Sequence, residues 1–419
     1  MNRNFTLFVV AGMVLGVLVG WACNAWLDAP AAKQAADDLG LITDIFLRLI
    51  RMIIAPLVFS TLVLGIAKME DAATVGRVGV RALGWFIVAS LVSLSLGLVI
   101  VTLLHPGAGL HLPLPPAGAK PEGVSAGDFT PEGFIAHIIP TSIIDAMAKN
   151  EILQIVIFSV LVGIAIASLQ KRAPAVVELV EQIVQIMLKV TGFVMMTAPL
   201  AIFAALASTV AEHGLSILVT YAGYIGGFYL ALLILWAMTI GAAWLFIGMR
   251  APKLVVAVRE PILVGFSTTS SEAAYPKTLE QLERFGIAPR IASFVLPLGY
   301  SFNLMGSMVY ATFAILFICQ AYDIHMTLGR QITMLLLLMV TSKGLAGVPR
   351  ASLVVILATL AYFSLPLAGL TLILAVDHIM DMGRTATNVM GNSIAAAVVA
   401  KWEKALGPPV EDLAQVNEL

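Results

Sequence analysis

Residues 377–392, DHIMDMGRTATNVMGN, place a row of charged and amide side chains inside an apolar segment at 367–402. Asp377, Asp381, Arg384, Asn388 and Asn392 are separated by four, three, four and four positions. Because an α-helix has about 3.6 residues per turn, these side chains line one helix face. Charged side chains within a membrane are costly and mark functional sites. The stretch therefore predicts a binding helix, unless Asp381 and Arg384 only satisfy each other as a structural ion pair.

The composition of the whole chain is that of a membrane protein. Of 419 residues, 60% are hydrophobic and 12% are charged, about half of the roughly 25% charged residues in a soluble domain. The mean hydropathy is +0.97. The formal net charge of -1 gives no basic field for nucleic acid, so no nucleic-acid partner is expected. Cys23 and Cys319 lie in apolar runs and are expected to be small buried side chains, not a disulfide or a metal pair.

Long apolar stretches predict an all-α polytopic membrane protein with eight transmembrane helices, since about 20 residues suffice for one span. The first stretch is expected to be a span, not a signal peptide, because it continues for about 20 residues without a cleavage site. The eight stretches lie near 5–26, 41–68, 79–104, 150–170, 183–211, 216–248, 289–321 and 367–402.

Basic residues concentrate in alternate connections between these stretches, for example at Arg77, Arg81, Lys171 and Arg172. The positive-inside rule then places the N-terminus in the cytoplasm, and eight crossings return the C-terminus there. Residues 105–131 are dense in Pro and Gly and predict an extracytoplasmic loop. We expect residues 1–404 to form one integrated membrane domain, followed by a cytoplasmic tail at 405–419.

Two segments, 251–285 and 325–364, are apolar at both ends and polar in the middle. Their centres read STTSSE at 267–272 and SKGLAGVPR at 342–350. Each apolar arm is too short to cross a bilayer, and irregular backbone at membrane depth survives only where protein or water satisfies it. We therefore expect two re-entrant helical hairpins, a feature of transporter binding sites. The alternative is a pair of amphipathic surface loops.

The seventh stretch, 289–321, carries Pro297, Gly299, Asn303 and Gly306 near its middle. These residues predict a helix that unwinds there, because Pro lacks an N–H and Gly weakens helices. Carbonyl groups freed by the unwinding could coordinate a cation.

Taken together, these motifs resemble the dicarboxylate/amino acid:cation symporters, the glutamate transporter homologues. The resemblance runs from end to end and includes MIIAPLVFSTLVLGIAKMED at 52–71, TAPLAIFA at 197–204, LPLGYSFNL at 296–304, SKGLAGVP at 342–349 and the stretch at 377–392. It implies a homotrimer in the inner membrane of a bacterium. It also implies a scaffold at about 5–68 and 132–211, and a transport core at about 79–104 and 216–402 that moves like an elevator.

The resemblance also implies roles for single residues. Arg384 matches the residue that binds the side-chain carboxylate of the substrate, and Asp381 the one that binds its amino group. Thr385 and Asn388 match contacts to the main-chain carboxylate and amine. The hairpin contacts match Ser270, Ser271, Gly347 and Val348.

The cation sites are where this sequence departs from sodium-coupled members. The site shared by the last two spans keeps Gly299 and Asn303, but its carboxylate position is Asn392. A deeper site of sodium-coupled members uses a phenol, a hydroxyl and a carboxylate that this chain lacks. Sodium needs oxygen ligands, so their loss disarms that site. The corresponding positions of the deeper site are Phe86, Ala89, Ser90 and Met305, and Ser342 is a further vestigial cation-site position. Proton-coupled members share Asn392 but usually keep an Asp where this chain has Met305.

We therefore expect proton coupling and no bound cofactor, with sodium coupling and uncoupled transport as alternatives. The candidate proton carriers and their partners are Glu272, Asp377, Asp381, His378 and Arg350. Asp381 favours L-glutamate or L-aspartate as substrate, because a C4-dicarboxylate such as succinate has no ammonium group to offset its charge. The C4-dicarboxylate branch carries Ser at this position, so succinate, fumarate or malate remain the alternative. A channel, a membrane enzyme and a receptor are disfavoured, since the sequence has no pore signature, no HExxH or triad pattern and no soluble output domain.

Overall fold

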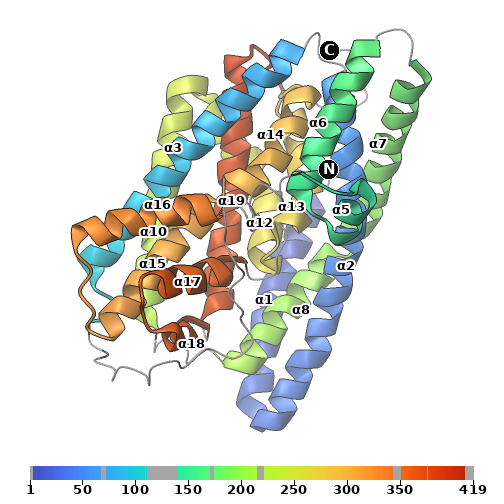
Figure 1. Ribbon diagram of the computed structural model, residues 1–419. Helices are drawn as coiled ribbons and strands as arrows, with labels where there is room; N and C mark the ends of the chain where they lie inside the picture. Colours follow the sequence, from blue (N-terminus) through green and yellow to red (C-terminus); the bar gives the residue numbers. More distant parts are fainter. Residues whose placement is uncertain are drawn as a thin grey trace.

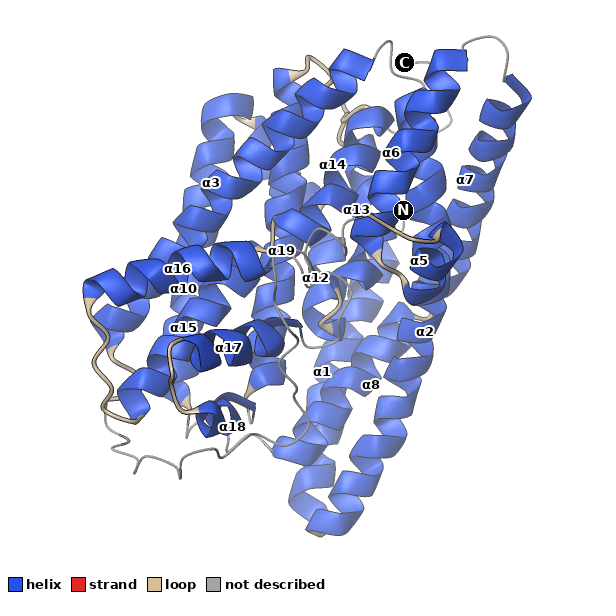
Figure 2. Ribbon diagram, in the orientation of Figure 1, coloured by secondary structure: helices blue, strands red, loops and turns tan. Residues whose placement is uncertain are grey.

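The protein is helical throughout its described residues, which are 3–67, 72–108, 110, 139–169, 174–214, 221–342, 351–374 and 376–410 in the computed structural model. Within these ranges the only extended pairing is an isolated bridge between Ile287 and Leu406 (Figure 2). The helices are α1 (Arg3–Trp26), α2 (Ala29–Ala67), α3 (Ala72–Leu104), α5 (Ile143–Lys149), α6 (Ile152–Leu169), α7 (Pro174–Met195), α8 (Ala198–His213), α10 (Ala222–Ile247), α11 (Arg250–Ala257), α12 (Arg259–Thr268), α13 (Ser271–Arg284), α14 (Pro289–Phe302), α15 (Met305–Ala321), α16 (Leu328–Thr341), α17 (Ala351–Tyr362), the 3-10 turn η3 (Leu367–Gly369), α18 (Leu370–Leu374) and α19 (Asp377–Trp402).

Three of the described segments are long and apolar enough to cross a membrane: Thr74–Leu104, Ala222–Ile247 and Pro289–Ala321. A fourth results if the bent pair Pro174–Val194 and Ala198–Glu212 counts as one span. Shorter apolar helices of 10–17 residues lie at Ala11–Trp26, Met52–Ala67, Gln154–Leu169 and Leu328–Thr341. The structure thus agrees with a helical membrane protein, and the eight-span topology stays a prediction.

The sequence prediction was wrong at three helix boundaries. Residues 29–40, expected in a connection, form the start of α2, because Asp28 caps the helix by accepting a hydrogen bond from the N–H of Ala31 at 3.1 Å. The stretch 183–211, expected as one span, is two helices that meet at an angle of 50°. Pro199 opens α8 and cannot continue the hydrogen bonding of α7. The last long helix begins at Asp377, not near 367.

The helices form two groups that lie side by side (Figure 1). In the first group, α1 and α2 pack on α8, and α2 also contacts α6 and α7. In the second group, α19 lies at the centre and contacts α3, α10, α12, α13, α14 and α15. Contacts of α2 with α13 and α14 join the two groups. The stretch with the polar stripe therefore lies in the interior of its group.

Small residues allow the closest helix contact of the first group. A Cβ added at Gly12, Gly16 or Gly20 of α1 would lie 2.5–2.7 Å from carbonyl oxygens of α8. Lipid is as apolar as a leucine side chain, so close backbone approach provides the packing contacts that hold such helices together. The first helix of the chain is in this way fixed to α8.

Interruptions lie where polar and Gly residues predicted them. The seventh stretch breaks between α14 and α15 at Asn303 and Leu304, whose backbone angles are not helical. The segment at 251–285 breaks at Thr269, which has a φ of +51°, before Ser270 caps α13. The arms α16 and α17 bound the second segment, and its centre at 343–350 lies outside the described residues.

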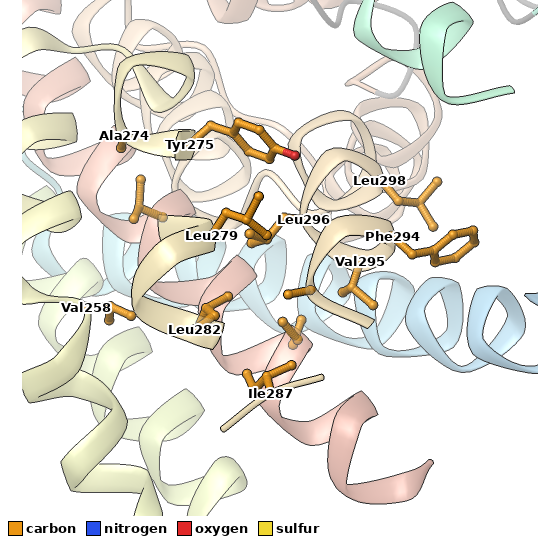
Figure 3. Packing of buried hydrophobic residues seen from close by; sticks show 14 of the residues in the cluster. Val258, Ala274, Tyr275, Leu279, Leu282, Ile287, Phe294, Val295, Leu296 and Leu298 are labelled. Atoms are coloured by element: carbon orange, nitrogen blue, oxygen red, sulfur yellow. The ribbon is translucent and has the colours of Figure 1, made fainter. Parts of the chain in front are cut away.

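Apolar packing fixes the second arm of the first hairpin. Tyr275, Leu279 and Leu282 of α13 are at most 1% exposed. Figure 3 shows Leu279 beside Leu296 of α14. The second arm of the hairpin is thus held in place by closely packed apolar side chains.

Candidate functional site

The polar stripe of α19 is buried and partly paired with itself. Arg384, 7% exposed, donates from Nε to Oδ1 of Asp381 at 2.9 Å, and its Nη2 contacts the same oxygen. Thr385 adds a hydroxyl donor to that oxygen at 3.1 Å. Arg384 Nη1 is buried and has no hydrogen-bond partner among the described residues. The predicted Asp–Arg pair therefore exists, but it leaves one charged donor arm unused.

Tyr310 of α15 holds the other side of this arginine. The Arg384 guanidinium carbon lies 5.1 Å from the centroid of the Tyr310 ring, a cation–π contact. The Tyr310 hydroxyl donates to Oδ1 of Asp377 at 2.7 Å. Asp377, the first residue of α19, thus holds the ring that lies over Arg384.

The sequence prediction missed Tyr310. A signal existed, because Ser307 and Tyr310 are three positions apart and share one face of an apolar helix. That face meets α19: the N–H of Gly306 donates to Oδ1 of Asn388 at 2.8 Å, and Nδ2 of Asn388 donates to Ser307 at 3.3 Å. Polar residues on both helices therefore mark one common interface.

Amide groups also stabilise the break between α14 and α15. Asn303 Nδ2 donates to Oδ1 of Asn392 at 2.9 Å, and the Asn303 N–H donates to the carbonyl of Gly299 at 2.7 Å. A Cβ at Gly299 would overlap Oδ1 of Asn392, so only Gly permits this approach. The predicted vestigial cation-site residues Gly299, Asn303 and Asn392 are thus brought together by the structure.

None of the side chains at these cation-site positions is a carboxylate. Sodium requires several oxygen ligands, usually with at least one carboxylate. Here the oxygens of Asn388 and Asn392 already accept N–H groups. Met305, 1% exposed, puts its thioether beside Gly391, where a Cβ would lie 2.5 Å from its sulfur. The deeper positions Phe86 and Ala89 are buried and carry no oxygen in their side chains; Ser90 is buried as well.

The first hairpin approaches the stripe through α12. A Cβ at Gly265 would lie 3.3 Å from the methyl group of Thr385. At the hairpin tip, Ser270 accepts a hydrogen bond from the N–H of Ala273 at 3.1 Å, and Ser271 and Glu272 begin α13.

Two further predicted residues, Ser342 and His378, lie in the described part of the chain, and three others lie outside it. Ser342, 3% exposed, donates its hydroxyl to the carbonyl of Met339 at 3.2 Å. His378 is half-buried on the first turn of α19. The predicted Gly347, Val348 and Arg350 lie outside the described residues.

Helix α10 supports α19 from its other side. Trp236 donates from Nε1 to the hydroxyl of Thr387 at 2.9 Å, and the Tyr229 hydroxyl donates to the carbonyl of Ile379 at 2.7 Å. A Cβ at Gly383 would lie 2.9 Å from atoms of Tyr229 and Leu232, so the two helices are in close contact. The stripe is therefore held in a fixed rotation about the axis of α19.

Known proteins are similar in sequence to this chain over almost its full length. The sequence profile described as the sodium:dicarboxylate symporter family matches residues 5–402. A C4-dicarboxylate transport protein of Laribacter hongkongensis is 40% identical over 402 residues, which cover 95% of this chain and 89% of the relative. A proton/glutamate-aspartate symporter of Escherichia coli is 39% identical over 412 residues, 96% and 94% of the two chains. A proton/sodium-glutamate symport protein of Bacillus subtilis is 36% identical over 405 residues, 96% and 93%.

Proposed function

Because the chain belongs to the sodium:dicarboxylate symporter family, we propose that it is a secondary symporter that imports L-aspartate or L-glutamate together with protons. The observation that carries the proposal is the charge arrangement at Arg384 and Asp381. Arg384 Nη1 is a buried charged donor without a partner in the described part of the chain. A carboxylate group with planar geometry is the ligand that a guanidinium binds best.

An acidic amino acid satisfies both members of the pair. Its side-chain carboxylate takes the donors of Arg384, and its ammonium group takes the Asp381 carboxylate that Arg384 releases. One ion pair within the protein is exchanged for two with the substrate, and the main-chain carboxylate of the substrate is the one charge left to neutral contacts. Thr385 and Asn388, on the same helix face, supply neutral contacts to the main-chain groups of the substrate.

A C4-dicarboxylate is the second candidate substrate. The relative from Laribacter hongkongensis, 40% identical to this chain, is a C4-dicarboxylate transport protein. Succinate would bind Arg384 as well, but it would leave Asp381 beside a second carboxylate unless Asp381 were protonated. The ion pair seen in the structure therefore supports the amino acid over the dicarboxylate.

Proton coupling is supported by the chemistry of the unwound segment. Its amides pair with each other, and Met305 takes a place where an oxygen ligand would be needed for sodium. Carboxyl groups that remain near the substrate are able to carry a proton instead. Our candidates for this role are Glu272, Asp377, Asp381 and His378, with Arg350 as the partner of Glu272.

We further propose an elevator-type movement in a homotrimer within the bacterial inner membrane, with both termini in the cytoplasm. The two helix groups support it: the group around α8 is the proposed scaffold, and the group around α19 is the proposed transport core. Native mass spectrometry of the purified protein in detergent tests the trimer, which a monomeric or dimeric mass would exclude.

Uptake by proteoliposomes tests the substrate and the coupling ion separately. Labelled aspartate, glutamate and succinate are offered under an inward proton gradient, an inward sodium gradient, or neither. We expect the proton gradient alone to accelerate uptake, and glutamate to compete with aspartate better than succinate does. Stronger competition by succinate overturns the amino acid substrate. Uptake driven by sodium and indifferent to the pH gradient overturns proton coupling.

The variant Met305→Asp is the companion test. A carboxylate at this buried position adds the hard ligand that the wild type lacks. We expect uptake by the wild type to depend on protons whether sodium or choline is the bulk cation. We expect sodium to raise the melting temperature of the variant only. A sodium-dependent melting temperature in the wild type would contradict our interpretation of this site.

A further inference from the structure

The bases of both hairpins are closed by the same pair of residues, an Arg and a Phe. At the first base, Arg250, the first residue of α11, donates from Nη2 to the carbonyl of Phe285 at 2.5 Å. At the second base, Arg330 in the first turn of α16 donates from Nη2 to the carbonyl of Phe363 at 2.9 Å. In each case the Arg begins the first arm of the hairpin, and the Phe directly follows the second arm. The first pair is 35 residues apart in sequence and the second 33.

Each Arg also lies over the ring of the Phe whose carbonyl it binds. The guanidinium carbon is 4.6 Å from the ring centroid of Phe285 in the first hairpin and 5.8 Å from that of Phe363 in the second. Both Phe residues are buried, at 6% and 7% exposure. A hydrogen bond from a charged donor and a cation–π contact thus act on one residue, which fixes the Phe more firmly than either contact would.

The segment that presents each Phe has the same local fold. The sequences are LERFGI at 282–287 and LAYFSL at 360–365. The residue after the Phe is left-handed in both, with a φ of +100° at Gly286 and +54° at Ser364. Each helix ends with a bond from the sixth residue of the motif to the first, Ile287 to Leu282 at 3.0 Å and Leu365 to Leu360 at 2.8 Å. This shared helix ending turns the Phe carbonyl back toward the first arm.

The two bases differ in what surrounds them. At the first base, the chain after α19 forms a strap: Gly407 donates its N–H to the carbonyl of Gly286 at 2.8 Å, and Val410 donates to that of Arg284 at 2.9 Å. Arg250 itself donates from Nη1 to the carbonyl of Gly407 at 2.8 Å. In the part of the chain that the structure describes, no such backbone strap crosses the base of the second hairpin, where Arg330 is exposed.

We propose that Arg250 and Arg330 are matched positioning residues that close the bases of the two hairpins, and that the Arg330–Phe363 clasp sets how readily the arms of the second hairpin separate. The strap makes the Arg250–Phe285 clasp one of several ties, so its loss has less effect. The functional part rests on the proposed transport function, because it assumes that the second hairpin helps to enclose the substrate. The structural part does not depend on it.

Amide hydrogen exchange of the purified full chain tests the structural part. In Arg330→Ala, we expect exchange at 359–365 to rise about tenfold, the effect of losing one charged hydrogen bond and a partly exposed cation–π contact. Arg330→Lys keeps a cation and a donor, and it should return exchange to within about threefold of the wild type. Arg250→Ala is the matched control, and exchange at 282–287 should rise by less than about threefold because the strap remains.

Uptake kinetics test the functional part with the same variants. Arg330→Ala should raise the half-saturating substrate concentration by about three- to tenfold while the maximal rate is kept, and Arg330→Lys should restore it. Phe363→Leu removes the ring but not the carbonyl, and should give a smaller shift; it also serves if Arg330→Ala fails to fold.

Unchanged exchange at 359–365 in both Arg330→Ala and Phe363→Leu overturns the clasp. So does a larger opening of the first base than of the second. Increased exchange at 359–365 with unaltered half-saturation shows that the clasp does not act on the substrate. A wild type that transports no acidic solute refutes the proposed function, and the exchange result still decides the clasp.

Discussion

Replacing Asp381 by Asn separates the two candidate substrates. In the structure one oxygen of Asp381 accepts the Nε donor of Arg384 at 2.9 Å and the hydroxyl of Thr385 at 3.1 Å. The Asn side chain keeps the size and one acceptor oxygen, so the variant changes charge more than shape. Without the carboxylate, the ammonium group of an amino acid loses its partner, and Arg384 becomes free to bind a dicarboxylate.

The size of the effect follows from the energy of one charged hydrogen bond. Such a bond contributes about 1.5–3 kcal/mol, so aspartate should bind about 10- to 100-fold more weakly to the variant. Succinate should gain about three- to tenfold, a smaller factor because the Asp381 side chain is 18% exposed and water screens part of its repulsion. The ratio of the two affinities should therefore change by about 30-fold or more.

Competition against labelled aspartate or succinate uptake in proteoliposomes measures this ratio. Asp377→Asn is the matched control, since it removes another buried carboxylate from the same helix, one that accepts from Tyr310 and not from Arg384. The control should weaken both substrates by similar factors and leave the ratio unchanged. Equal losses for both substrates in Asp381→Asn would refute the assignment of Asp381 to the ammonium group.

Two further variants test the packing around the stripe. Gly306→Ala should abolish uptake and lower the yield of folded protein, because its Cβ would overlap the carbonyl oxygen of Arg384 and lie 2.8 Å from its Cα; Gly241→Ala, where nothing lies within 4 Å of the added Cβ, should behave as wild type in both measurements. Trp236→Phe loses the 2.9 Å hydrogen bond to Thr387 and should lower the stability by about 1 kcal/mol; in a double-mutant cycle of thermal melting, adding Thr387→Val should cost little more, and full additivity would show that the bond is unimportant.

The sequence predicted the features that arise from local chemistry. A polar stripe at helical spacing fixed the inner face of α19, and Asn303 between Gly299 and Gly306 marked the unwound segment. Helix boundaries were less predictable. The start of α2 depends on a single capping Asp28, and the bend before α8 depends on Pro199 within a run that is apolar throughout. Hydropathy averages over about 20 residues, so it does not register either signal.

Contacts between distant segments were beyond the sequence for a different reason. The spacing of Tyr310 from Ser307 marks a polar helix face, but it does not identify the partner Asp377, which lies 67 positions away in sequence. The Arg–Phe clasps are likewise visible only when both arms of a hairpin are present. What the sequence does hold is the repeated ending LERFGI and LAYFSL, whose shared pattern becomes meaningful once each Phe carbonyl is seen to face an Arg.

The contacts of the unwound segment constrain how any coupling can work. In a site completed by a cation, the ion supplies the positive charge that holds the backbone oxygens together. Here two neutral hydrogen bonds to side-chain oxygens link the break between α14 and α15 to α19: Nδ2 of Asn303 donates to Asn392, and the N–H of Gly306 donates to Asn388. Under the proposed function, the gradient acts on the carboxyl groups beside the substrate, where gaining a proton changes the charge that Arg384 and the substrate experience.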